Sequence, residues 1–136
     1  MCKNGKCLCG AVRYEGKGEH KGVQVCHCPD CVRWTGGPLM ALEFSGGADI
    51  SGDVRWFKSS GWAERGSCAI CGTAMFWRMQ DGSMLTVTAG SLDDVASLGP
   101  ITEHIFVEHK NDYYDFSDSA PRVTGAELIA RFQDQN

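Results

Sequence analysis

The sequence has no long apolar run and no excess of positive charge. None of its apolar stretches approaches the roughly 20 residues that a membrane-spanning helix needs, so no membrane partner is expected. The segment Met1–Lys6 is polar and no apolar stretch follows it, so no secretory signal is expected. The net charge is −4 and the pI is about 5.5, whereas a general nucleic-acid-binding domain is usually basic. We therefore expect no nucleic-acid partner.

The sequence also lacks the composition of a disordered chain. Hydrophobic residues make up 43% and charged residues 22% of the 136 residues, which is an ordinary globular balance. A chain of this length typically forms one domain, so we predict a single domain over residues 1–136. Without a secretory signal the expected location is cytoplasmic, where structural disulfides are rare.

Cysteine is the residue type that needs an explanation, because the chain has eight. Two Cys-x-Cys pairs and two Cys-x-x-Cys pairs occur among them. Neighbours this close are better placed to bind one ion together than to form disulfides with distant partners. The cysteines are Cys2, Cys7, Cys9, Cys26, Cys28, Cys31, Cys68 and Cys71.

The pattern of apolar residues and turn signals predicts a mainly β fold with little helix. Asp81-Gly82 predicts a hairpin turn between strands at 73–79 and 84–89. Thr124 and Glu127 form a capping box, which predicts a short C-terminal helix. The other expected elements are a helical turn at 29–35 and strands at 6–14, 23–27, 39–44, 54–58 and 101–107.

The first predicted metal site combines two cysteine pairs that lie far apart in the sequence. Alternation along a strand places Cys7 and Cys9 on one face. Cys68 and Cys71 have the spacing of a zinc knuckle, and Gly72 can adopt the positive φ that such a turn often needs. Four thiolates form a closed tetrahedral site, which is the arrangement of structural zinc.

The second predicted metal site is the short cluster of Cys26, Cys28 and Cys31. Three thiolates within six residues can reach one ion, and three protein ligands with an open fourth position are typical of catalytic zinc. His27 points away from its two neighbours if the strand is regular, which favours a surface or hydrogen-bonded histidine over a ligand. A three-ligand site is also expected to bind its ion more weakly than a four-ligand site.

A second closed site is the alternative for this cluster. Cys2 could supply a fourth thiolate, although it lies near the terminus, where ordering is costly. His104 or His109 could also complete the site.

Taken together, the cysteine motifs resemble the glutathione-dependent formaldehyde-activating enzyme family, which also contains centromere protein V. The resemblance runs from about Gly5 to Asp115, and the combined seven-cysteine pattern is specific although each piece alone would be weak. The chain departs from the family by having Gly66-Ser67 before Cys68, where relatives often have an aromatic residue. The segments that carry it are Gly5-Lys6-Cys7-Leu8-Cys9-Gly10-Ala11-Val12-Arg13-Tyr14, Cys26-His27-Cys28-Pro29-Asp30-Cys31, Cys68-Ala69-Ile70-Cys71-Gly72-Thr73 and His104-Ile105-Phe106-Val107.

The resemblance implies a fold of small curled antiparallel β-sheets around zinc, also seen in methionine sulfoxide reductase B and a Rab-exchange chaperone. It implies two zinc ions, one structural and one catalytic. The structural ligands correspond to Cys7, Cys9, Cys68 and Cys71, and the catalytic ligands to Cys26, Cys28 and Cys31. Both sets agree with the spacing argument.

The family's chemistry implies a carbon–sulfur lyase-type enzyme that adds glutathione to formaldehyde and gives S-hydroxymethylglutathione. A coordinated thiol is deprotonated, and the thiolate is the nucleophile. Glutathione carries two carboxylates, so its pocket should offer a cation. Arg33, two residues after Cys31, is the candidate, and an exposed surface charge is the alternative interpretation of it.

Two other classes of function stay open at the level of sequence. A scaffold protein would hold two structural zinc ions and recruit a partner through an exposed face. A redox enzyme would need a reactive thiol outside the metal sites, and Cys2 is the cysteine left for that role. Exposed strand edges could also pair two copies of the chain as a homodimer.

Overall fold

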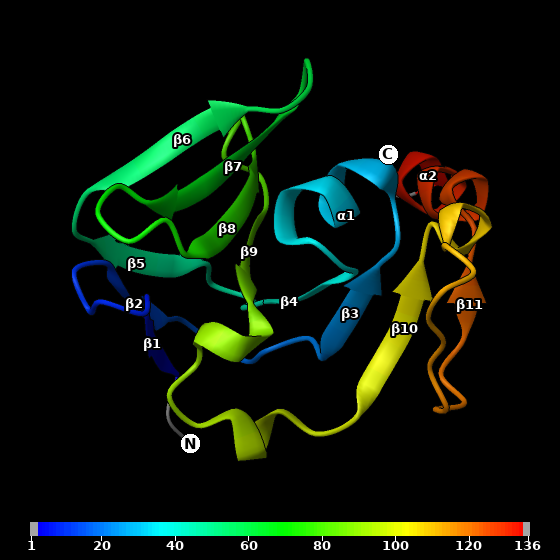
Figure 1. The fold of residues 1–136 in the computed structure, drawn as a ribbon, viewed down its shortest axis with the longest axis horizontal. Coiled ribbons are helices and arrows are strands. Elements are labelled where there is room, and N and C mark those ends of the chain that lie inside the picture. The colour runs from blue at the N-terminus through cyan, green and yellow to red at the C-terminus, as the bar shows by residue number, and fades with distance from the viewer. Residues whose placement is uncertain (1–2, 135–136) are drawn as a thin grey trace. The chain divides into compact units, whose positions relative to one another are not determined.

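A computed structural model describes residues 3–134 of the chain. Within this range the chain forms eleven strands, two α-helices and three short 3-10 helices (Figure 1). The chain folds as two compact units, residues 1–22 with 41–99 and residues 23–40 with 100–136. The mainly β class is confirmed, and the prediction of a single domain over 1–136 stays a prediction. No helix among residues 3–134 is long and apolar enough to span a membrane.

The first unit is built from antiparallel strands. Three of them form a small sheet in the order β1-β2-β5. Five others lie side by side, each paired with the next, in the order β4-β9-β8-β7-β6. The strands are β1 (Asn4–Lys6), β2 (Arg13–Gly16), β4 (Leu39–Glu43), β5 (Ala48–Ser51), β6 (Val54–Lys58), β7 (Ala63–Cys68), β8 (Ala74–Met79) and β9 (Leu85–Thr88). Two 3-10 helices follow, η1 (Ala89–Ser91) and η2 (Val95–Leu98).

Aromatic packing around Phe76 forms the centre of the first unit. Phe76 is fully buried, with the edge of Tyr14 at 5.6 Å and the stacked ring of Trp56 at 5.9 Å between ring centroids. Aromatic side chains contribute large buried areas, so these three rings join β2, β6 and β8 through one contact cluster. The predicted hairpin is confirmed, since β8 pairs with β9 and Gly82 has a φ of +81°.

The second unit has a parallel sheet, which the sequence did not predict. Its strands β3 (Val23–Cys26), β10 (Ile101–Ile105) and β11 (Arg122–Val123) run in the same direction (Figure 1). Ile105, Val123 and Leu128 form its buried apolar core. The remaining elements are α1 (Pro29–Thr35), η3 (Val107–His109) and α2 (Gly125–Asp134).

Both predicted helical segments are confirmed, and local capping explains their limits. Helix α1 begins after Cys28, whose sulfur accepts a hydrogen bond from the Cys31 N–H at 3.4 Å. It ends at Gly36, which has a φ of 85°. At the start of α2, the Thr124 hydroxyl accepts from the Glu127 N–H, and the Glu127 carboxylate accepts from the Thr124 N–H. These reciprocal bonds are those of the predicted capping box.

The strand predicted over residues 6–14 is wrong. Strand β1 ends at Lys6 and β2 begins at Arg13, and the residues between them form a tight turn in which Gly10 has a φ of +83°. Cys7 and Cys9 therefore lie in a turn and do not share a strand face. Cys26 likewise ends β3, while Cys28 caps α1.

Candidate metal centres

The four sulfur atoms of Cys7, Cys9, Cys68 and Cys71 all lie within 4.8 Å of one another, inside the first unit. Cys9 Sγ is 3.6 Å from Cys7 Sγ and 3.8 Å from Cys68 Sγ. A tetrahedron with Zn–S bonds of about 2.3 Å separates its sulfurs by roughly 3.8 Å. The described cysteines are free, so these distances are spacings between thiols and not disulfide bonds. The cluster could hold one metal ion and fits zinc.

Backbone N–H groups point at two of these sulfurs. Val12 N–H donates to Cys7 Sγ at 3.3 Å, and the N–H groups of Ile70 and Cys71 donate to Cys68 Sγ at 3.4 Å. The turn at Cys68 closes through Gly72, whose φ is +79°. Hydrogen bonds to an anion favour the charged form, so both turns are suited to thiolates.

The exposed Cys71 thiol has a lowered pKa. A hydrogen bond with the Thr73 hydroxyl, at 3.0 Å, is the main cause that lowers the pKa of Cys71 to about 5. A low pKa places the sulfur in the protonation state that a metal requires.

Cys26, Cys28 and Cys31 bring their three sulfurs within 4.8 Å of one another, inside the second unit. The neighbouring thiols Cys28 and Cys31, together with burial, raise the pKa of Cys26 well above its ordinary value. Crowded thiols of this kind cannot all ionise unless a cation compensates their charge. The donor set therefore also fits a metal ion such as zinc.

No fourth His, Cys, Asp or Glu among residues 3–134 joins this three-cysteine cluster. Both ring nitrogens of His27 are already engaged, with the Tyr114 hydroxyl at 2.7 Å and His104 Nδ1 at 2.9 Å. The second nitrogen of His104 bonds Asp118 at 2.9 Å, so His104 does not close the site either. Cys2, the other candidate, lies outside the described residues.

Arg33 lies in the last turn of α1 and is exposed. It lies two residues after Cys31 on the same short helix. The assignment of Arg33 to glutathione binding stays a prediction.

Tyr114, His104 and Asp118 are polar residues whose contacts with His27 and with one another the sequence did not predict. They form a hydrogen-bonded series with His27, and both histidines are only 1% exposed. Burial is the first cause that lowers the pKa of His27 to about 4. His27 is hydrogen-bonded, as expected, although Cys28 caps α1 and does not continue a regular strand. No sequence signal identified its partner Tyr114, which lies in the irregular segment 110–121.

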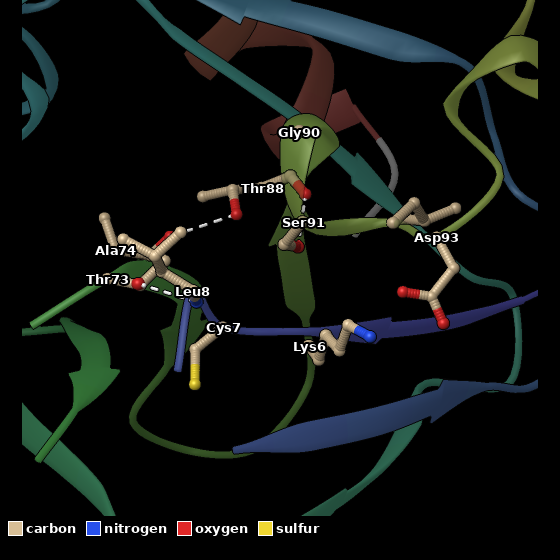
Figure 2. A pocket seen from close by; sticks show the side chains of 10 residues that line it. Lys6, Cys7, Leu8, Thr73, Ala74, Thr88, Gly90, Ser91 and Asp93 are labelled. Carbon is tan, nitrogen blue, oxygen red and sulfur yellow. Dashed lines mark hydrogen bonds between the residues drawn. The ribbon is translucent and has the colours of Figure 1, made fainter. Parts of the chain in front are cut away.

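A groove of about 760 Å³ lies beside the four-cysteine cluster in the first unit. Figure 2 shows Leu8 and Thr73 toward one end of the groove and Lys6 and Asp93 toward the other. The Thr73 hydroxyl accepts a hydrogen bond from the Leu8 N–H at 3.1 Å, which joins the two cysteine turns at the groove wall. The groove is thus shaped by the same turns that bring the four cysteines together.

Comparison with known proteins finds relatives of this chain. The chain is 27% identical over 128 residues to an uncharacterised lyase of Schizosaccharomyces pombe, covering 92% of this chain and 93% of the relative. A crystal structure of a Rhodobacter sphaeroides protein has a similar fold, with a TM-score of 0.56 and 20% identity over 72% of this chain and 96% of the other. The family model described as glutathione-dependent formaldehyde-activating enzyme matches residues 2–109. The chain belongs to the glutathione-dependent formaldehyde-activating enzyme family.

Proposed function

We propose that this protein is a zinc-dependent carbon–sulfur lyase-type enzyme that joins glutathione to formaldehyde or a related aldehyde. The observation that carries the proposal is the cluster of Cys26, Cys28 and Cys31, which no fourth protein ligand among residues 3–134 completes. Membership of the family and the similarity to a protein named as a lyase support the lyase-type class. The specific pair of substrates is our proposal.

In the proposed reaction a thiol RSH and formaldehyde give RS–CH2–OH. One S–C bond forms, the C=O bond becomes a C–O single bond, and the proton of the thiol is balanced by the new hydroxyl proton. Zinc bound by the three cysteines would keep an incoming thiol in its thiolate form, which is the nucleophilic form. The protein then contributes by holding two small reactants together.

The chain's own residues shape the three-cysteine cluster through α1. The Cys31 N–H donates to Cys28 Sγ at 3.4 Å, which holds the sulfur at the N-cap of the helix. Cys31 is buried inside the helix, so water reaches the cluster from the side of Cys28 and Cys26. We propose that the incoming thiol approaches from this side.

Arg33 is our proposed contact for a carboxylate of glutathione. It is exposed on the helix that carries Cys31, so its guanidinium is free to meet a solvent-borne anion. Arginine binds carboxylates with paired N–H donors, and lysine lacks this geometry. An Arg33→Lys variant is therefore expected to weaken glutathione binding without changing zinc content.

The four-cysteine cluster is proposed to hold the structural ion. It connects the turn after β1 with the end of β7, which lie 59 residues apart between Cys9 and Cys68. A metal that closes so long a loop contributes to folding directly. We propose that the protein works in the cytoplasm, where glutathione keeps thiols reduced, and that it acts on small molecules and not on nucleic acids or membranes.

A Cys28→Ser variant tests the proposal, with Cys71→Ser as the matched change in the other cluster. Native mass spectrometry should find two zinc ions in the wild type and one in folded Cys28→Ser, which should also lose thiol-dependent turnover. Cys71→Ser should instead lose stability, because its ion is structural. Unfolding of Cys28→Ser, or two zinc ions in the wild type that glutathione never perturbs, would indicate a scaffold with two structural sites.

A further inference from the structure

Strand β6 forms an edge of the larger sheet, because β7 is the one strand that pairs with it among residues 3–134. The other strands at sheet edges are shorter, since β1, β5 and β11 have three, four and two residues against five in β6. Unpaired edges are usually protected by short length, by proline or by a bulge. Strand β6 has no proline, and its register with β7 runs from Val54 to Lys58 without a shift. These three protections are therefore weak or absent in β6.

The register with β7 determines which backbone groups of β6 lack a partner strand. The Ala69 N–H donates to the Asp53 carbonyl at 3.0 Å, so these two residues occupy a hydrogen-bonded position of the antiparallel ladder. Such positions alternate along the ladder, so Arg55 and Phe57 also direct their N–H and C=O groups toward β7. The backbone groups that point toward the open edge are those of Val54, Trp56 and Lys58.

The side chains of β6 alternate between a packed face and an exposed face. Trp56 packs inward, stacked on Phe76 with 5.9 Å between ring centroids, and the Arg78 guanidinium lies 3.5 Å from the centre of its ring. On the opposite face Arg55 is exposed, and the Phe57 side chain is 67% exposed. The exposed face therefore presents a cation and an aromatic ring two residues apart, and such groups attract each other across neighbouring strands.

We propose that β6 pairs with β6 of a second copy of this chain, antiparallel and about a twofold axis at Trp56. In this register Val54 faces Lys58 of the second copy, and Arg55 faces Phe57 of the second copy. The three residues whose backbone groups point outward then meet at hydrogen-bonded positions. Arg55 and Phe57 meet at the closer, non-hydrogen-bonded positions, and the symmetry makes this cation–π contact twice. The inference does not depend on the proposed reaction.

Charge and strand length select this register over its neighbours. An axis at Arg55 would place the two Arg55 side chains directly opposite each other, and like charges in that position are destabilising. An axis at Phe57 would leave Val54 and Arg55 opposite residues 59 and 60, which lie beyond β6. Charged side chains protect many edge strands, but with the axis at Trp56 neither cation of β6 faces another cation. The strand is thus complementary to itself.

Sedimentation velocity of the zinc-loaded protein measures the association. The dimer fraction should rise with concentration between roughly 1 µM and 1 mM, because the interface is small. Amide hydrogen exchange followed by NMR then locates the interface. The amides of Val54, Trp56 and Lys58 should exchange about tenfold more slowly in a sample that is about nine-tenths dimer, because only the remaining tenth has an open edge. The amides of Arg55 and Phe57 should already be protected in the monomer, since they bond β7.

A charge exchange tests the register. Phe57→Lys places a cation opposite Arg55 of the second copy, removes two contacts at once and should weaken the dimer by roughly tenfold or more. Arg55→Glu added to the same chain turns both repulsive pairs into ion pairs and should restore association to within about threefold of wild type. Val95→Lys is the matched control, because Val95 is 53% exposed on η2 and its replacement should leave association unchanged.

Each outcome decides the proposal. A wild-type chain that stays monomeric up to about 1 mM would overturn it and would leave β6 to solvent or to an acidic strand of another protein. A dimer in which the outward amides of β6 exchange at the monomer rate would have its interface elsewhere and would overturn it too. A folded double variant as weak as Phe57→Lys would refute the axis at Trp56. The exchange measurement uses the wild type, so it decides the interface even if Phe57→Lys does not fold.

Discussion

Two glycines on either side of β5 provide a controlled test of how the four-cysteine cluster is supported. Gly47 precedes the strand with a φ of +76°, and Gly52 follows it with a φ of +98°. A Cβ at Gly47 would meet no atom within 4 Å, whereas one at Gly52 would lie 2.2 Å from the Ala11 carbonyl oxygen and 2.9 Å from Val12 Cα. Alanine at the two positions therefore differs mainly in the clash with the chain at Ala11.

The magnitude follows from two separate costs. A positive φ costs a non-glycine residue roughly 1–2 kcal/mol, which applies to Gly47→Ala and Gly52→Ala alike. Overpacking against backbone adds typically about 1–3 kcal/mol, which applies to Gly52→Ala alone. Gly52→Ala should therefore be less stable than Gly47→Ala by about 1–3 kcal/mol.

The clash should also reach the metal. Val12 donates its N–H to Cys7 Sγ at 3.3 Å, and Cys7 donates its N–H to the Val12 carbonyl at 3.0 Å. Moving Ala11 and Val12 away from residue 52 therefore displaces Cys7, and Gly52→Ala should release zinc to a competing chelator faster than Gly47→Ala.

Urea unfolding of the zinc-loaded variants, together with a chelator-release time course, measures both effects. Equal unfolding midpoints and equal release rates for the two variants would refute the argument, because they would show that the Ala11 turn moves without cost to Cys7. Wild-type protein supplies the reference for both measurements.

Three further predictions concern stability. Phe76→Ala should lower the free energy of unfolding by about 3–5 kcal/mol, because Phe76 is fully buried; a urea midpoint close to wild type would contradict its central place in the core. Thr124→Ala should cost about 1 kcal/mol through loss of the cap of α2, measured by thermal unfolding, and no loss would mean that the cap contributes little. Burial acts to raise the pKa of Glu103, but hydrogen bonds from Arg131 and Gln24 lower it below its ordinary value. Ionised Glu103 therefore stabilises the fold at pH values above the ordinary glutamate pKa, and this stabilisation is lost as the pH falls through the lowered pKa. Glu103→Gln should therefore flatten the acid limb of the pH–stability curve, and an unchanged limb would contradict this.

The sequence predicted the features that depend on residues close to one another in the chain. The turn at Asp81-Gly82, the short helix after Pro29 and the capped helix after Thr124 all follow from signals within a few residues. Cysteines two or three residues apart can bring their sulfurs together in a strand or in a turn. The structure therefore has the predicted four-cysteine and three-cysteine clusters, although the strand predicted for Cys7 and Cys9 was wrong.

Long-range pairing was not predictable in the same way. The parallel alignment of β3 with β10 joins residues such as Val25 and His104, and no periodicity in either strand specifies the direction of its partner. The contact of Asp118 with His104 arises in an irregular segment without alternating apolar residues. Arg65 shows the limit of composition arguments, because this arginine is only 7% exposed although basic residues usually face solvent.

The parallel pairing of β3 with β10 has a consequence for the order of assembly. The strand that ends at Cys26 is synthesised early, but its parallel partner begins at Ile101, and all of residues 41–99 belong to the other compact unit. On the ribosome the three-cysteine segment must wait for most of the chain before this parallel pairing of its strand can form. Pairing between strands so far apart in the sequence slows folding. If the three thiols bind a metal ion before β10 is made, this binding would compete with the pairing of β3 and β10 in the correct register.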